Sequence, residues 1–253
     1  MKRSLVMTVV IILVAVLAGS VAAEILYENR FESGASLNDL YIHGTTDYGI
    51  VVGAAPCPSF LVGYNVLWMN GVGNTPCSVF ADGYWDNFNY SVWAKVTSNV
   101  MEYINVFFRV QETGGNWYGL TNGYCVHCRH SQNEIALQRV VNGLGTPIQT
   151  VTYDFVPGTW YNICVEAGDG TDPTHIRVYV NTVCDPMNEL LISAYDDEYA
   201  YGGVGVGCLS SGGGGAVVDG WFDRMRVTTI GHNDDDPSAT EAVTWGGIKS
   251  LYR

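Results

Sequence analysis

The sequence predicts an all-β fold in which two antiparallel sheets pack face to face. Short segments rich in β-branched and aromatic residues recur along the chain, and glycine, proline, asparagine or aspartate separates them. Few stretches have the apolar spacing of a long helix. The chain of 253 residues contains 30 glycines and 12% aromatic residues, which is typical of strands joined by tight turns. A sandwich of roughly 200 residues can form a single domain of this class.

Residues 1–23 have the three regions of an export signal. Lys2 and Arg3 precede an apolar run at 5–18, and small residues at 21–23 offer a cleavage site. The run is shorter than the roughly 18 residues that a membrane span needs, and an uncleaved anchor is the alternative. We therefore expect a secreted, cell-surface or periplasmic protein with no stable membrane span after cleavage.

Three further segments follow the signal. Residues 24–230 are predicted to form the sandwich domain. Residues 231–243 have the acidic, polar composition of a solvated linker. Residues 244–253 become apolar again and carry three apolar side chains three positions apart: Trp245, Ile248 and Leu251. A helix this short is not stable alone in water, so we expect it to dock on its own domain or on another protein, with self-association as one outcome.

The mature chain is strongly acidic. Removal of the signal takes away two of the 12 basic residues and none of the 25 acidic ones, so the formal charge changes from −13 to −15. Such a chain is repelled by nucleic acid and by anionic lipid. We expect no nucleic-acid partner.

All seven cysteines lie beyond the signal, at 57, 77, 125, 128, 164, 184 and 208. In an oxidising compartment most of them would pair, and at least one would be left over. The connectivity stays open. The one pair that we predict is Cys57 with Cys77, because proline flanks both in loop-like sequence.

The first half of the domain is predicted to contain short strands joined by turns. They occupy 24–31, 48–52, 59–62, 66–69, 87–96, 105–111, 117–120, 123–130 and 134–141. The segment 87–96 gives the clearest signal, because Phe88, Tyr90 and Val92 alternate with polar residues. The last two strands are predicted to form a hairpin around the turn 131–133.

The second half is predicted to contain strands at 151–155, 160–166, 175–180, 202–211 and 217–227. In 202–211, Val204 and Val206 alternate with glycines, which indicates that bulky neighbours or another backbone pass close to this strand. The segment 217–227 has a period of two. Each of its two faces mixes apolar and charged residues, however. Phe222 lies on the same face as two arginines, and Trp221 lies on the same face as aspartates and valines.

The order of these features resembles the concanavalin A-like jelly roll, specifically the laminin-G-like and 3-keto-disaccharide hydrolase-like domains of exported bacterial proteins. The segments that carry the resemblance lie between residues 24 and 230, at 27–34, 105–109, 116–118, 158–163, 176–181, 203–207 and 222–223. The resemblance implies a sandwich of two curved antiparallel sheets, and often an adhesive or carbohydrate-binding module.

An enzyme of this fold that cuts polysaccharides would need two carboxylates flanking the scissile bond. Related glucanases carry them as Glu-x-Asp-x-Glu on one strand, and no such run exists here. Acids on predicted strands, such as Glu134 and Glu166, occur singly, as solvated side chains do. We therefore assign no catalytic residue, and a hydrolase of keto-disaccharides or glycosides stays the alternative.

Two kinds of metal site are considered. The segment 125–130 holds two cysteines and two histidines, but a strand points Cys125 and Cys128 to opposite faces, so buried thiols or a disulfide are favoured over zinc. Calcium is the usual ion of the resembled family and takes oxygen ligands from loops. Candidates are Asp169 with Asp172, the acids at 196–198, and Glu28 with Asp219 and Asp223. Ordinary solvated acids are the competing interpretation.

Several aromatic residues in predicted loops are candidates for stacking on sugar rings. They are Tyr84, Trp85, Trp117, Tyr118, Tyr195, Tyr199 and Tyr201. Packing at the rim of the core is the competing interpretation. The sequence thus predicts a non-catalytic module that binds glycan or a cell-surface protein, with disulfides and a structural calcium ion. A structural surface subunit that docks through residues 245–253 is a further alternative.

Overall fold

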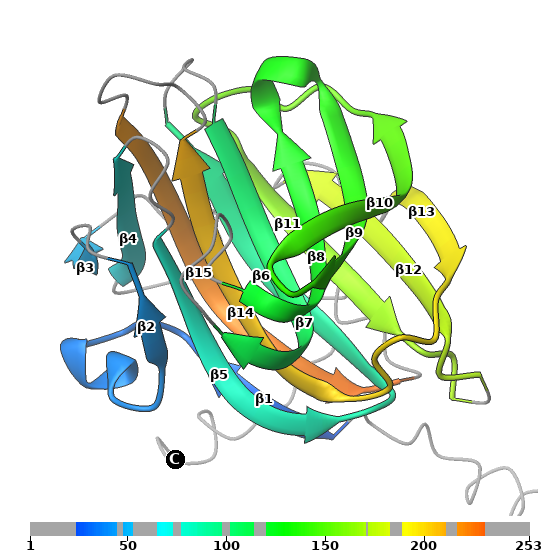
Figure 1. Cartoon of the computed structure of the whole chain (residues 1–253). Helices are drawn as coiled ribbons and strands as arrows, with labels where there is room; N and C mark the ends of the chain where they lie inside the picture. The colour runs from blue at the N-terminus through cyan, green and yellow to red at the C-terminus, as the bar shows by residue number, and fades with distance from the viewer. Residues whose placement is uncertain are drawn as a thin grey trace, which may run out of the picture.

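The chain folds into two antiparallel β-sheets packed face to face, as the computed structural model shows (Figure 1). The structure describes residues 24–44, 48–52, 65–72, 77–97, 102–113, 120–170, 172–182, 189–210 and 217–230. Their only helices are two 3₁₀ turns, η1 (Gly34–Leu37) and η2 (His130–Gln132), and neither could cross a membrane. The all-β sandwich predicted from the sequence is confirmed.

The eight-stranded sheet has the spatial order β13, β12, β11, β6, β15, β4, β3, and β1 also pairs with β15. Its strands are β1 (Ile25–Asn29), β3 (Tyr48–Val52), β4 (Asn65–Val72), β6 (Phe88–Val96), β11 (Trp160–Ala167), β12 (His175–Thr182), β13 (Glu189–Tyr195) and β15 (Val217–Thr229). Because β1 pairs with β15, the first and last strands lie side by side.

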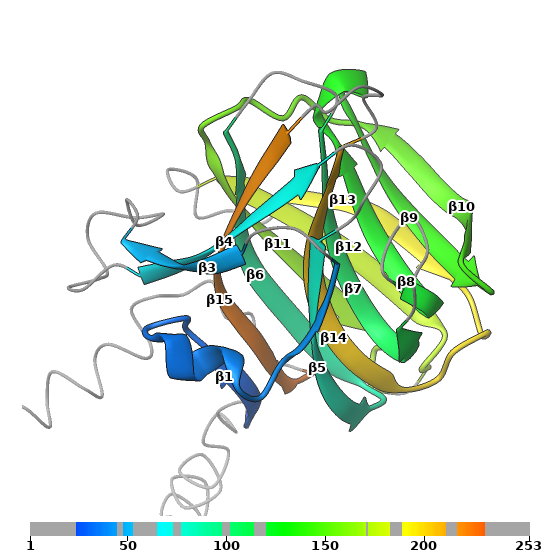
Figure 2. The same cartoon turned by 60° about the vertical axis from the view of Figure 1, so that its left-hand side comes forward.

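The seven-stranded sheet has the order β10, β9, β8, β7, β14, β5, β2. Its strands are β2 (Tyr41–His43), β5 (Cys77–Trp85), β7 (Glu102–Thr113), β8 (Leu120–Arg129), β9 (Glu134–Val141), β10 (Leu144–Thr152) and β14 (Gly202–Ser210). The predicted hairpin is formed by β8 and β9. Figure 2 shows the two layers from a second side.

The core lies between the sheets and follows from the alternation of the strands. β6 sends its apolar residues inward, as predicted: Phe88, Tyr90, Val92 and Ala94 are buried. Val106 and Phe108 of β7 meet them from the opposite sheet. The Tyr90 hydroxyl donates to the carbonyl of Gly205 at 3.0 Å and so links the layers. Each large apolar side chain buried in this way contributes about 1.5 to 3 kcal/mol.

The glycines of β14 make room for aromatic rings on the outer face of the seven-stranded sheet. A Cβ added at Gly205 would lie 2.5 Å from the Phe80 ring, and one at Gly207 would lie 3.0 Å from the Phe107 ring. The two rings have centroids 5.1 Å apart and close this face over the strand. The prediction that bulky neighbours pass close to these glycines is confirmed.

A β-bulge in β15 explains why strict alternation placed apolar and charged residues on the same face of this strand. The pairing with β6 shifts register between Asp223 and Arg226, and Arg224 has a φ of 49°. Because of the extra residue, Phe222 and Met225 both enter the core although an uninterrupted strand would point them to opposite faces. Unbroken alternation from 217 to 227 was therefore a wrong prediction for the residues beyond the bulge.

Arg109 is fully buried at one end of the sandwich. Its φ of 47° marks an irregularity in β7. The guanidinium donates to the carbonyls of Tyr199 at 3.1 Å, Asp86 at 2.8 Å and Pro173 at 2.6 Å, which lie in three different connections. Burial lowers the pKa of Arg109. This one side chain therefore holds three loops together.

Four strands were not predicted, or only in part: β2, β5, β10 and β13. In β5, Asp82 and Gly83 suggest a turn, and Pro147 interrupts the pattern of β10 at a register shift. β10 and β13 are edge strands, and Ile192 is the only fully buried residue of β13. Edge strands bury little, so their alternation is weak.

Candidate functional site

The outer face of the eight-stranded sheet is lined by aromatic and polar side chains. Because the apolar residues of β6 and β11 point into the core, the intervening residues point outward. We call this surface the aromatic–amide face. It consists of Trp68, Asn70, Asn89, Trp93, Lys95, Trp160, Asn162, Asn181, Asp219, Trp221 and Asp223.

Four of these residues form a row across neighbouring strands. Trp68 of β4 is directly opposite Trp221 of β15, Trp221 is opposite Lys95 of β6, and Lys95 is opposite Trp160 of β11. We call this set the tryptophan row. With strands about 4.8 Å apart, it extends over roughly 14 Å. The Lys95 ammonium lies 4.4 Å from the ring centroid of Trp221 and 4.8 Å from that of Trp160.

A second row lies beside the first. Asp223 is opposite Trp93, Trp93 is opposite Asn162, and Asn162 is opposite Asn181. Trp93 is half-buried, whereas both asparagines are buried between larger side chains. The second row therefore adds amide groups beside the aromatic rings.

Some polar atoms of this face have no hydrogen-bond partner in the part of the chain that the structure describes. They include the indole Nε1 of Trp221 and the amide Oδ1 atoms of Asn70 and Asn162. Buried polar atoms are almost always hydrogen-bonded, so unpaired donors and acceptors grouped on one surface need a partner from solvent or a ligand. By contrast, the indole of Trp68 already donates to Asp219 at 3.0 Å.

Asp223 carries the most perturbed carboxyl group of the face. It is 5% exposed, and burial raises its pKa from 3.8 to about 7, although a backbone hydrogen bond at Arg224 opposes the shift. The carboxyl therefore titrates near neutral pH.

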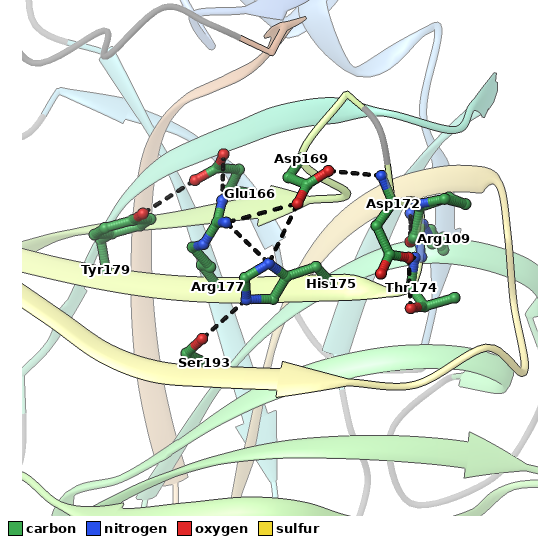
Figure 3. A network of polar contacts seen from close by, with 10 residues as sticks. Arg109, Glu166, Asp169, Asp172, Thr174, His175, Arg177, Tyr179 and Ser193 are labelled. Atoms are coloured by element: carbon green, nitrogen blue, oxygen red, sulfur yellow. Dashed lines mark hydrogen bonds and ion pairs between the residues drawn. The ribbon is translucent and has the colours of Figure 1, made fainter.

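A polar network occupies the β11–β12–β13 part of the same face (Figure 3). Arg177 donates to Glu166 at 2.8 Å and to Nδ1 of His175 at 2.8 Å. Nε2 of His175 lies 2.9 Å from the Ser193 hydroxyl, and Nδ1 lies 3.6 Å from Asp169. The order serine, histidine, aspartate resembles a nucleophilic triad.

The arginine decides the chemistry of this network. Because Arg177 donates to Nδ1, the neutral imidazole of His175 must carry its proton on Nε2. Nε2 then donates to Ser193 and cannot remove its proton, as a general base would. The arrangement orients side chains beneath the exposed ring of Tyr195, which stacks on His175 with centroids 4.4 Å apart.

The aromatic residues predicted to bind sugar are not brought together. Tyr84 is 87% exposed and pairs with Tyr201 at 5.7 Å between centroids, and Tyr195 stands alone over His175. Trp85 packs against Tyr27 and Phe88, and Tyr199 packs against Tyr124 and donates to the carbonyl of Val140. For Trp85 and Tyr199, rim packing is the better interpretation. Trp117 and Tyr118 lie outside the described residues.

The predicted calcium ligands are also kept apart. β1 and β15 are adjacent as expected, but Glu28 is paired with Arg30, Arg224 and Arg226. Burial alone would raise the pKa of Glu28, and the arginines outweigh it and lower the pKa. The Asp219 carboxylate accepts a hydrogen bond from the indole Nε1 of Trp68. Glu28 and Asp219 therefore have other partners in this structure, and a metal site of Glu28, Asp219 and Asp223 stays a prediction. Over the described part of the chain, no three histidines, cysteines or carboxylates gather to hold a metal.

The cysteine predictions have mixed outcomes. Cys125 and Cys128 point to opposite sides of β8, and burial raises the pKa of both thiols. They are buried thiols, as expected, and no zinc cluster forms from them. No disulfide joins two cysteines within the ranges that the structure describes. Cys57, and with it the predicted pair with Cys77, falls outside those ranges.

Sequence reasoning did not find the tryptophan row. It placed Trp93 and Lys95 on the polar face of their strand, and that was the available signal, because a tryptophan among polar outward residues has no core to fill. The neighbours of Lys95 in the row come from strands far apart in the sequence. Their alignment depends on the strand order of the sheet.

No protein-family model matches the sequence, and a search of curated proteins gives no match. Solved structures do match in fold. The carbohydrate-binding module CBM66 from Bacillus subtilis has a TM-score of 0.53 at 14% identity, with 76% of this chain and 96% of that chain covered. The exoplasmic domain of VIP36 bound to Ca²⁺ and mannose has a TM-score of 0.58 at 12% identity, covering 83% and 93%.

The lectin UEA-II complexed with galactose gives a TM-score of 0.55 at 12% identity, with 82% of this chain and 100% of the lectin covered. Identities at this level are informative about the fold only. Taken with the two antiparallel sheets and the paired first and last strands, they show that the chain has the concanavalin A-like jelly-roll fold.

Proposed function

We propose that the protein is a non-catalytic carbohydrate-binding module whose ligand lies on the aromatic–amide face. The observation that carries the proposal is the tryptophan row beside unpaired indole and amide groups on one sheet surface. An indole ring offers apolar area to the C–H face of a pyranose. Amide and indole groups can bond the hydroxyls, which donate and accept.

The fold supports the same proposal. The structural neighbours include a carbohydrate-binding module, VIP36 with bound mannose, and the lectin UEA-II in complex with galactose. The outer face of the seven-stranded sheet is a weaker candidate, because Phe80, Asn105 and His127 on it are at most 2% exposed.

We place this module outside the cytoplasm, as the export signal at 1–23 predicts. Residues 1–23 and the docking segment at 244–253 both lie outside the described residues. The hydrolase alternative has no support from the polar network, because Arg177 contacts both Glu166 and Asp169. A structural calcium ion stays a prediction, and the Ca²⁺-bound neighbour VIP36 is the observation that favours it.

A glycan array with the mature chain, followed by calorimetry on the best ligand, tests the proposal. Trp93→Ala and Trp221→Ala are each expected to weaken binding about tenfold, because each removes one stacking ring worth about 1.4 kcal/mol. Tyr84→Ala, which removes an exposed ring elsewhere, is the matched control and should leave affinity unchanged.

Two outcomes would contradict the proposal. If Tyr84→Ala abolished binding and the tryptophan variants did not, the ligand would lie on the Tyr84 and Tyr201 pair. If no glycan bound, and self-association were lost on deleting residues 244–253, the structural-subunit alternative would be favoured. Thermal unfolding of each variant shows whether it is folded.

A further inference from the structure

Lys95 differs from the arginines on the outer face of the eight-stranded sheet. Arg177 is paired with Glu166 at 2.8 Å, and Arg226 lies 3.7 Å from Glu28. Lys95 has no ion pair and no hydrogen bond with any residue that the structure describes, and its contacts are the two indole rings. Burial lowers the pKa of Lys95, as it does for an ammonium group that has lost water without gaining a counter-charge.

The neighbour of Lys95 in the row has a free donor as well. Trp221 lies directly opposite Lys95, and its Nε1 is buried without a hydrogen-bond partner among the residues that the structure describes. Two unsatisfied donors, one of them positively charged, are therefore adjacent on two strands. An oxyanion accepts hydrogen bonds from such a pair more strongly than a neutral hydroxyl does.

The same row shows how such a donor is satisfied by a carboxylate. The indole Nε1 of Trp68 donates to Asp219 at 3.0 Å, and Asn70 also points its amide at Asp219, at 3.4 Å. Within the described ranges, no acid takes the equivalent place at the Nε1 of Trp221. The position that Asp219 fills for Trp68 is left to a ligand at Trp221 and Lys95.

We propose that Lys95 and Trp221 recognise the carboxylate of an acidic sugar, so that the glycan bound on the aromatic–amide face contains uronic acid. This inference rests on the proposed carbohydrate-binding function and gives it a substrate class. Lys95 is its specificity-determining residue. Because the ammonium is held between two rings, it is already ordered before the ligand arrives.

Calorimetry with three matched probes tests the inference. They are an oligoglucuronate, the glucose oligosaccharide of the same linkage and length, and the sulfate ester of that glucose oligosaccharide. The wild type should bind the oligoglucuronate at least about tenfold more tightly than the neutral oligosaccharide, as a charge-assisted hydrogen bond implies. Lys95→Met, which keeps an unbranched apolar chain between the rings, should abolish that preference, so that the variant binds the oligoglucuronate and the neutral oligosaccharide with equal affinity.

Arg139→Met on β9 of the other sheet removes the same charge and is the matched control; it should keep the preference. Trp221→Phe removes the indole donor and keeps a ring, so it should reduce the preference for the oligoglucuronate. This variant tests the inference if Lys95→Met does not fold.

Equal affinity of the wild type for the acidic and neutral oligosaccharides would overturn the inference and leave the proposed function intact. If Lys95→Met lost the same factor of affinity for the acidic and the neutral oligosaccharide, the inference would also be overturned. Tightest binding of the sulfate ester would overturn the carboxylate assignment. If none of the probes bound and the array were also blank, the proposed function itself would fail.

Discussion

Replacing Asp223 by asparagine measures the cost of burying this carboxyl group. Its pKa is raised from 3.8 to about 7, mainly by burial. Between these values the folded protein keeps the proton that the unfolded chain has lost, so the free energy of unfolding falls as the pH rises from about 4 to about 7. At 1.36 kcal/mol per pKa unit, the loss is about 4 kcal/mol. Asparagine has the shape of the protonated acid and does not titrate.

Asp223→Asn is therefore expected to match the wild type at about pH 3.5 and to be about 4 kcal/mol more stable at about pH 9. Urea unfolding followed by tryptophan fluorescence over a pH series measures the difference. Asp172→Asn is the control with the opposite sign, because hydrogen bonds from the Thr174 hydroxyl and backbone N–H lower the pKa of Asp172. The argument would be refuted if Asp223→Asn were more stable than the wild type by the same amount at every pH, or if it were no more stable at high pH.

Three further predictions follow from the structure. Arg109→Met should lower the free energy of unfolding by at least about 3 kcal/mol, because three carbonyls lose a charged donor; a loss below 1 kcal/mol in urea unfolding would contradict this. Gly205→Ala should cost about 1 to 3 kcal/mol from overpacking against Phe80, whereas Gly34→Ala, with no atom within 4 Å of the new Cβ, should change little. Sugar affinity measured in EDTA should equal that in calcium, since indoles, amides and an ammonium hold the ligand in the proposed site; loss of binding on chelation would place a metal in the site.

Much of the fold could be predicted because its signals are local. The alternation of 87–96 fixes which residues of β6 enter the core, and the glycines of β14 indicate close neighbours. β10 and β13 were predicted poorly because an edge strand buries few side chains. The bulge at Asp223 was not predicted, since one extra residue reverses the alternation and the sequence carries no marker for it.

The candidate site was much less predictable. The aromatic residues chosen from loops, such as Trp85 and Tyr199, proved to pack at the rim of the core, because an aromatic ring beside a turn can fold back onto the strands. Glu28 was proposed as a calcium ligand because the first and last strands were expected to lie side by side and bring it to Asp219 and Asp223. The pairing of β1 with β15 places it opposite Arg226 instead.

The sequence by itself determined the all-β class, the acidic surface charge and the face to which each residue of a regular strand points, because these depend on composition and on a period of two. Tertiary structure alone decided which outward residues meet. Trp68, Lys95, Trp160 and Trp221 are neighbours because the sheet order β4, β15, β6, β11 brings four distant strands together in register. Strand order and register are set by packing of the whole core, and no local pattern records them.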